Sequence, residues 1–240
     1  MPSSCRYTPI VSAFLTVVLA GCVTSTADDP NAAATPAASS PAGAPGATAD
    51  GTPLAQAVAA LPVAAEHDGG YDRDLFKHWN AGADPDDGCD TREELLIAEA
   101  VKAPEQGSDC RLSGGQWLSY YDEVTVTDPS ELDVDHMVPL EESWSSGAWK
   151  WTDDRREAFA NDLAADRSLV AVTARTNRSK GAKDPADWLP PAESAQCTYA
   201  ADWTATKLRW SLTADQAERA ALDEIAADCP DTTVRYQPAP

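Results

Sequence analysis

An aspartate and a histidine stand next to each other, at Asp135 and His136, inside the apolar stretch of residues 131–140. The alternation of polar and apolar residues in this stretch predicts a β-strand. Neighbouring side chains on a strand point to opposite faces, so a site that uses both residues needs a bend or a strand end, which Pro139 supports. A carboxylate suits a hard divalent cation, and an imidazole accepts a proton near neutral pH. The pair therefore indicates metal-assisted hydrolysis; the alternative is a histidine that is simply hydrogen-bonded within the core.

A second apolar stretch, residues 168–173, is rich in β-branched residues and predicts another strand after a long connection. Four cations lie within nine residues directly after it, around Asn177, in a chain whose formal net charge is −21. These cations are Arg175, Arg178, Lys180 and Lys183. Contacts to phosphate groups come from Lys and Arg side chains. A basic segment beside a polar strand end therefore predicts substrate binding; the alternative is a solvated face.

The order of these features resembles that of the HNH endonucleases, whose site is a ββα-metal motif. The closest resemblance is to the secreted branch that is similar to the C-terminal domain of GmrSD-type restriction enzymes. The residues that carry it are Leu132–Leu140 (LDVDHMVPL), Ser146-Gly147-Ala148, Phe159-Ala160-Asn161-Asp162, Asn177-Arg178-Ser179-Lys180-Gly181 and Asp184–Pro190, with flanks at Cys89–Arg92 and Cys197–Tyr199. The resemblance thus covers nearly all of the expected folded domain, and its central motif is specific.

Carried over by position, the resemblance implies that His136 is the general base that activates a water. It implies that Asp135 and Asn177 hold one divalent cation, Mg²⁺ or alternatively Mn²⁺ or another divalent ion. This chain has Ser168 where many family members have an asparagine that orients the imidazole. Asn161 is the candidate to supply that role from the connecting loop.

The first 21 residues predict a secretory signal, because a short basic start precedes an apolar run over residues 11–20. The run is too short to span a bilayer comfortably. Residues 19–22 (Leu-Ala-Gly-Cys) resemble a bacterial lipobox, which implies cleavage before Cys22 and lipidation of its thiol. The stretch 22–53 is Ala-, Pro-, Gly- and Ser-rich, and such a composition predicts a disordered tether behind the lipid anchor.

Residues 54–230 are expected to form one α+β domain, with a ββα-metal core of hairpin and helix, flanking helices and short strands, and a flexible tail over 231–240. Helices are predicted over 55–65, 91–101, 153–163 and 197–210, with one more after residue 213, and short hairpins over 110–127. Thr91 with Glu94 matches a capping box, and Thr213 with Gln216 matches a second cap.

Four cysteines remain in the exported part of the chain, an even number that suits disulfides in an oxidising compartment. Three pairings are possible. We favour Cys89–Cys110 and Cys197–Cys229, because each pair brackets a local unit. The absence of any C-x-x-C pair from the sequence argues against a zinc site. Each closed loop stabilises the fold by ~3 kcal/mol.

Taken together, these features predict a metal-dependent endonuclease that hydrolyses phosphodiester bonds of nucleic acid, DNA in preference to RNA. We expect a monomer, anchored to the membrane through its lipid on the extracellular face or secreted. The net charge of −21 argues against tight nonspecific binding of nucleic acid. One alternative is a non-catalytic surface-binding lipoprotein that retains the HNH fold, and another is a phosphodiesterase with a small substrate.

Overall fold

The computed structural model describes residues 51–240. The predicted signal peptide (residues 1–21), the lipidation site Cys22 and nearly all of the predicted tether (22–53) lie outside the described residues. Within residues 51–240, no helix has both the length and the apolar character needed to cross a membrane.

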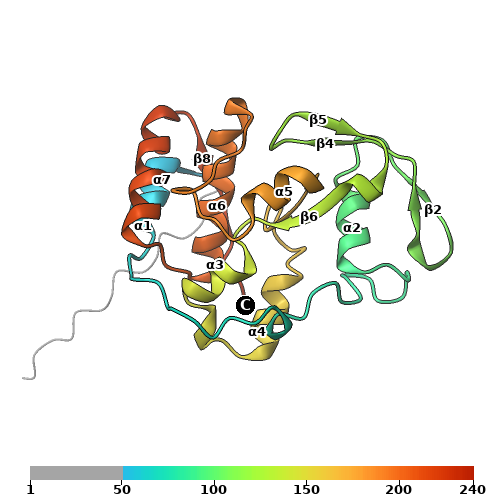
Figure 1. Cartoon of the computed structure of the whole chain (residues 1–240), viewed down its shortest axis with the longest axis horizontal. Coiled ribbons are helices and arrows are strands. Elements are labelled where there is room, and N and C mark those ends of the chain that lie inside the picture. The colour runs from blue at the N-terminus through green and yellow to red at the C-terminus, as the bar shows by residue number, and fades with distance from the viewer. Residues whose placement is uncertain (1–50) are drawn as a thin grey trace, which may run out of the picture. The chain divides into compact units, whose positions relative to one another are not determined.

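The centre of the fold is an antiparallel pair of strands followed at once by a helix. Strand β6 (Leu132–His136) pairs with β7 (Leu169–Thr173) along all five residues of each strand. Helix α5 (Ala174–Lys180) begins at the next residue and lies beside β6 (Figure 1). Gly181 ends α5 with a φ of 59°, in the left-handed region that glycine adopts at low cost. The predicted α+β class and its ββα core are confirmed.

Short helices and two-stranded sheets surround this core. The other helices are α1 (Leu54–Ala60), α2 (Thr91–Ala98), α3 (Leu140–Ser145), α4 (Asp153–Ala160), α6 (Gln196–Trp210) and α7 (Gln216–Asp228). The other strands are β1 (Thr52–Pro53), β2 (Glu105–Gln106), β3 (Leu112–Ser113), β4 (Trp117–Ser119), β5 (Val124–Val126) and β8 (Thr233–Val234). Strand β1 pairs with β8, β2 with β3, and β4 with β5, all antiparallel.

Two apolar clusters enclose the β6–β7 hairpin. The larger joins α1, α6 and α7, which contact one another, and it includes Val170 and Val172 of β7. The smaller joins α2 to the β4–β5 hairpin and includes Leu132 and Val134 of β6. Because the hairpin is covered on both faces, any polar side chain on it must find a partner or open onto a pocket.

Both favoured disulfides are present, Cys89–Cys110 and Cys197–Cys229. The first closes a loop with a sequence separation of 21 residues, which contains α2 and β2. The second has a separation of 32 residues and joins the start of α6 to the end of α7.

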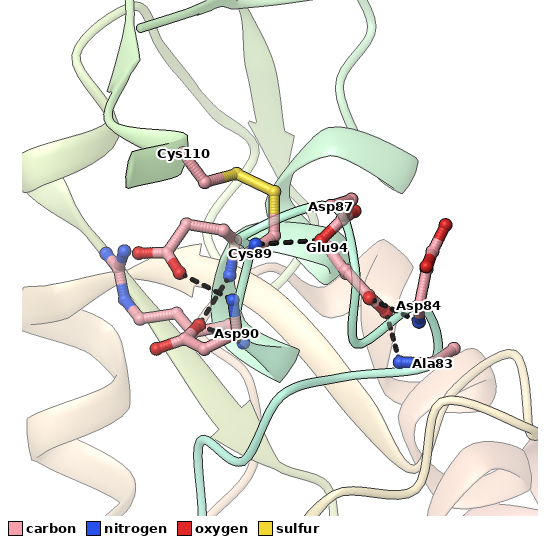
Figure 2. The surroundings of a disulfide bond; sticks show 9 residues. Ala83, Asp84, Asp87, Cys89, Asp90, Glu94 and Cys110 are labelled. Carbon is pink, nitrogen blue, oxygen red and sulfur yellow. Dashed lines mark hydrogen bonds between the residues drawn. A yellow bond between two sulfur atoms is a disulfide. The ribbon is translucent and has the colours of Figure 1, made fainter. Parts of the chain in front are cut away.

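The loop that leads into α2 is fixed by side chains as well as by the first disulfide (Figure 2). Glu94 of α2 accepts hydrogen bonds from the backbone N–H groups of Ala83 (2.8 Å) and Asp84 (2.9 Å). Asp87 accepts one from the N–H of Cys89 at 2.7 Å. The chain upstream of α2 is therefore held against the domain although it contains little regular structure.

Two helix starts differ from the predicted ones. Asp90, rather than Thr91, caps α2, and Glu93 completes the capping box by accepting from the N–H of Asp90. Asp215, rather than Thr213, caps α7. In both cases the predicted threonine uses its hydroxyl in a tertiary hydrogen bond instead. The N-cap residue is then a nearby aspartate, Asp90 or Asp215. Aspartate is at least as favourable as threonine at this position.

The folded part also extends beyond both predicted boundaries. Strand β8 lies within the range 231–240, and it pairs with β1, within the range assigned to the tether. Val234 is only 2% exposed, and the carbonyl of Gln237 accepts a hydrogen bond from Arg209 at 2.7 Å. The C-terminal residues were expected to be a flexible tail; instead, backbone pairing and apolar burial hold them to the domain.

A buried ammonium group joins three helical regions. Lys207 of α6 donates to Glu142 of α3 (2.7 Å) and to Glu218 of α7 (2.6 Å), and all three side chains are buried. Burial raises the pKa of Glu142 to about 8, although the charge of Lys207 acts in the opposite direction. Burial also raises the pKa of Glu218. Near neutral pH the two carboxyl groups of this cluster therefore keep a proton in the folded state, whereas the same groups have released it in the unfolded chain.

We expect the free energy of unfolding to fall as pH rises from about 5 toward 8, because the folded state then binds more protons than the unfolded state. The slope from this cluster reaches at most ~1.4 kcal/mol per pH unit. Glu142→Gln removes the titrating group and should flatten the profile. Chemical denaturation of both proteins from pH 5 to pH 9 measures this. Glu141→Gln, at an exposed neighbour, is the control and should keep the wild-type slope; equal slopes for Glu142→Gln and wild type would contradict the assignment.

Candidate active site

Asp135 lies near the end of β6 and is 5% exposed. Its Oδ2 atom accepts hydrogen bonds from the hydroxyl of Tyr121 at 2.7 Å and from the ammonium of Lys180. Burial raises the pKa of Asp135, while Lys180 lowers it. No hydrogen bond of the described residues ends on Oδ1. One carboxylate oxygen is therefore locked in place and the other remains available.

Lys180, the last residue of α5, is completely buried. Its Nζ donates to the carboxylate of Asp135. It also donates to two backbone carbonyls, those of His136 and Met137, and each of these two bonds is 2.9 Å long. An ammonium group has three donors, so all of them are used. The ring centroid of Tyr121 lies 5.7 Å from Nζ, and those of Tyr199 and Trp203 lie 5.8 Å away. Lys180 therefore clamps the end of α5 onto the end of β6.

His136, the last residue of β6, has its imidazole held in one tautomer. Its Nε2 lies 2.9 Å from the backbone carbonyl oxygen of Ala160, at the end of α4. A carbonyl oxygen only accepts hydrogen bonds, so Nε2 carries the proton and Nδ1 keeps its lone pair. No hydrogen bond within residues 51–240 involves Nδ1. A bare, oriented ring nitrogen is what a general base requires.

Aromatic rings surround the imidazole and keep it neutral. Trp79 stacks on His136 with ring centroids 5.5 Å apart, and Phe159 lies parallel to it at 6.4 Å. The ring of His78 stands edge-on at 6.3 Å. Burial lowers the pKa of His136 to about 3, against the hydrogen bond to Ala160, which raises it. The ring is therefore unprotonated across the physiological pH range.

Asn177 of α5 has its side-chain amide oriented by an aspartate. Its Nδ2 donates to Oδ2 of Asp133 at 3.3 Å, which leaves Oδ1 without a hydrogen bond to any described residue. The Nε of Arg178 lies 3.6 Å from the same Asp133 oxygen. Asp133 is thus a structural partner of α5, and the amide oxygen of Asn177 remains free.

These side chains meet at one pocket of about 310 Å³. The residues lining it include Asp135, His136, Asn177, Arg178, Tyr71 and Arg73. Carboxylate and amide oxygens are ligands that Mg²⁺ accepts, alongside several waters. The free oxygens of Asp135 and Asn177 therefore fit a hard divalent ion. Within the described residues there is no group of three or more His, Cys, Asp or Glu side chains that could hold a metal.

Comparison with known proteins identifies the family. Residues 97–225 match the family described as GmrSD restriction endonucleases, C-terminal domain. A protein of Arthroderma benhamiae named "Uncharacterized secreted protein" is 40% identical over 160 residues, which cover 67% of this chain and 76% of the relative. The chain belongs to the GmrSD C-terminal domain family. No solved structure matches the chain.

The family match includes Asp135, His136, Asn177 and Lys180, but the structure changes the expected role of the last of these. We had expected Lys180 to bind substrate. It is instead inaccessible to a phosphate, because its three donors are taken by internal acceptors. Lys180 is a positioning residue for Asp135.

Among the described residues, the side chain of Asn161 forms no hydrogen bond to the imidazole that it was expected to orient. Its Nδ2 donates to the carbonyls of Lys77 and Glu157, each at 2.8 Å, and its Oδ1 accepts from the N–H of Asn80 at 3.1 Å. Asn161 therefore anchors residues 77–80 to α4. The backbone carbonyl of Ala160, the residue before Asn161, orients the imidazole instead. A role played by a backbone group cannot be read from the side-chain types in a sequence.

The remaining predicted residues are more peripheral. Arg178 lines the pocket, while Arg175 is exposed on α5. Lys183 lines a neighbouring acidic pocket of about 390 Å³, and its Nζ donates to the carbonyl of Ser179. Ser168 donates to Asp162, away from His136. All three cations are exposed, and Arg178 is also paired with Asp133.

Several site residues of this family member escaped the sequence reasoning. Tyr71 and Arg73 line the pocket, and Trp79 stacks on His136, yet all three precede the family match at residue 97. Tyr121, a buried aromatic residue between β4 and β5, donates a hydrogen bond to the candidate metal ligand Asp135. The only available signal was the mixture of aromatic and charged residues over 71–79.

We expect Lys180→Met to reduce the free energy of unfolding by about 3–5 kcal/mol, because it leaves the buried Asp135 carboxylate unpaired. Asp135→Asn should be destabilising as well, since it leaves the buried ammonium of Lys180 without a charged partner. Urea denaturation measures both. Lys183→Met removes an exposed lysine nearby and should lie within ~0.5 kcal/mol of wild type. A Lys180→Met protein as stable as this control would refute the clamp.

Proposed function

We propose that this chain is an endonuclease that hydrolyses phosphodiester bonds of nucleic acid, with DNA as the preferred substrate. The observation that carries the proposal is the unprotonated Nδ1 of His136, in the same pocket as the free oxygens of Asp135 and Asn177. Membership of a family described by its restriction endonucleases supports the same chemistry.

In the proposed reaction His136 removes a proton from a water at the pocket. The water oxygen forms a bond to phosphorus, the bond from phosphorus to one ester oxygen breaks, and that oxygen gains a proton from solvent. The carbonyl of Ala160 keeps Nε2 protonated, so that Nδ1 alone faces the water. The stacked ring of Trp79 limits rotation of the imidazole. General bases contribute about 10²–10⁴-fold to rate, most when their pKa lies near the operating pH, so the burial that lowers the pKa of His136 reduces its strength as a base.

Asp135 and Asn177 would hold one divalent cation, Mg²⁺ or Mn²⁺. When bound, such an ion stabilises charge that develops on the phosphate and on the leaving oxygen. Tyr121 and Lys180 fix the carboxylate of Asp135 so that its second oxygen is presented for binding. Asp133 does the same for the amide of Asn177.

Arg178, Arg175 and Lys183 would contact phosphates on either side of the cleaved bond. The chain as a whole repels nucleic acid, because it carries 39 acidic and 18 basic side chains. Binding should therefore be weak, local and strongly reduced by salt.

We place this activity outside the cell. Two disulfides suit an oxidising compartment, and the Arthroderma benhamiae relative is named a secreted protein. Lipidation of Cys22, with anchoring to the membrane, is a further part of the proposal.

The test is incubation of the purified protein with supercoiled plasmid in Mg²⁺ or EDTA. We expect nicked and linear products in Mg²⁺ and none in EDTA. His136→Ala should lower the rate by about 10²-fold or more. The matched control is His67→Ala, because His67 stacks on Trp149 and does not line this pocket. Plasmid that stays intact in Mg²⁺, Mn²⁺ and other divalent ions would favour a non-catalytic binding protein instead.

Metal binding has its own measurement. Titration of Mn²⁺ followed by electron paramagnetic resonance should show weaker binding for Asn177→Ala, because one of two protein oxygens is lost. Asn80→Ala, at an exposed asparagine outside the pocket, serves as the control. Equal Mn²⁺ affinity in Asn177→Ala and wild type would remove Asn177 from the ligand set.

A further inference from the structure

Arg73 is a guanidinium on the wall of the candidate active site that neither the sequence motif nor the family match includes. It lies in the short helix η1 (Arg73–Leu75), upstream of the matched residues 97–225. It lines the same pocket as Asp135, His136 and Asn177. The pocket therefore has a wall that comes from about sixty residues before the Asp-His motif.

The guanidinium is oriented by a histidine. Nδ1 of His78 lies 2.7 Å from the carbonyl oxygen of Phe76, so Nδ1 carries the proton and donates. Nε2 of His78 is then an acceptor, and Nη2 of Arg73 lies 3.4 Å from it. Arg73 also lies within hydrogen-bonding reach of the hydroxyl of Tyr71. A guanidinium has five N–H donors, so donors remain for another partner.

Arg73 forms no ion pair within the described residues. The other cations near the site do: Lys180 pairs with Asp135, and Arg178 with Asp133. Glu141 also lines the pocket but is not joined to Arg73 by an ion pair. In a chain with a twofold excess of acidic side chains, an arginine without a carboxylate partner at a pocket is set up to bind an external anion.

The segment that carries Arg73 is anchored to the domain. Phe76 is fully buried, and the carbonyl of Leu75 accepts from Nε of Arg156 at 3.3 Å. Asn161 holds Lys77 through its backbone carbonyl. Trp79 has a φ of 60°, which is costly for a bulky residue and is compensated by its stacking on His136. An anchored arginine loses little entropy when it binds a ligand.

We propose that Arg73, held by His78, binds a phosphate of the nucleic acid within the active-site pocket. This inference rests on the proposed function and names a phosphate-binding residue for it. The guanidinium binds two phosphate oxygens at once, a geometry that lysine does not reproduce. It thereby holds the phosphate against the face of the pocket that bears Asp135 and Asn177, and offsets negative charge there during the reaction.

The first test measures binding of a fluorescein-labelled DNA duplex by anisotropy in EDTA, where no metal-assisted cleavage occurs. Arg73→Met should weaken binding roughly tenfold at low salt, because one charge-assisted contact is lost. The slope of log K against log salt concentration should also become shallower by ~0.9. Arg111→Met is the matched control, because Arg111 is exposed between β2 and β3 and lines neither pocket. If Arg73→Met and Arg111→Met bind DNA equally, with equal salt slopes, the proposal is overturned.

The second test concerns the role of His78. Glutamine can donate to the carbonyl of Phe76 and accept from Arg73 with the same side chain, so His78→Gln should retain most of the binding. His78→Leu should weaken DNA binding. In an Arg73→Met background the same change should cause no further loss of affinity, because both substitutions remove the same interaction. Additive losses in the double variant would show that His78 does not act through Arg73.

Cleavage assays separate this inference from the proposed function. If wild type fails to cleave while Arg73→Met still weakens DNA binding, hydrolysis is refuted and the phosphate contact stands. If wild type cleaves and Arg73→Met matches Arg111→Met in both cleavage and binding, the contact alone is refuted. Arg73→Lys should keep part of the affinity but lower kcat by roughly tenfold, because the two-point contact is lost.

Discussion

The structure depends on one buried ammonium group, that of Lys180. The β6–β7 hairpin is covered on both faces by apolar clusters, so a charged residue on β6 is tolerated only with a partner. Lys180 supplies that partner for Asp135 and also bonds to two backbone carbonyls at the end of β6. The contact sets the position of α5, and α5 in turn carries Asn177. A single electrostatic constraint thus decides where both candidate metal ligands lie.

The imidazole beside this clamp is controlled by other parts of the chain. Helix α4 contributes the carbonyl of Ala160, and the segment upstream of α2 contributes the stacked ring of Trp79. Together they fix the tautomer and the orientation of His136, while burial keeps it neutral. The site is therefore assembled from several separate regions of the sequence around the end of one strand.

The charged groups at the candidate site do not follow the acidic character of the whole chain. The chain carries a net charge of −21, yet the carboxylates of Asp133 and Asp135 at this site are each paired with a cation of α5. The pocket therefore presents Arg73 beside these neutralised carboxylates, with Glu141 as a further acidic side chain in its lining. An acidic protein and a phosphate-binding pocket are compatible for this reason.

The sequence by itself determined the two paired strands, the Asp135–His136 motif at a strand end and a favoured disulfide pairing that the structure contains. The helix of the ββα core, which carries Asn177 near its middle, was implied by the resemblance to the HNH endonucleases. These features are local, because strand periodicity, helix signals and short motifs depend on neighbouring residues. Only the tertiary structure decided what each polar side chain touches. Lys180 and Asn161 have residue types that suit substrate or catalysis, but packing turns the first toward Asp135 and the second toward Lys77. Packing also brings Arg73 to the pocket from far upstream, and no local pattern encodes a contact between residues so distant in the chain.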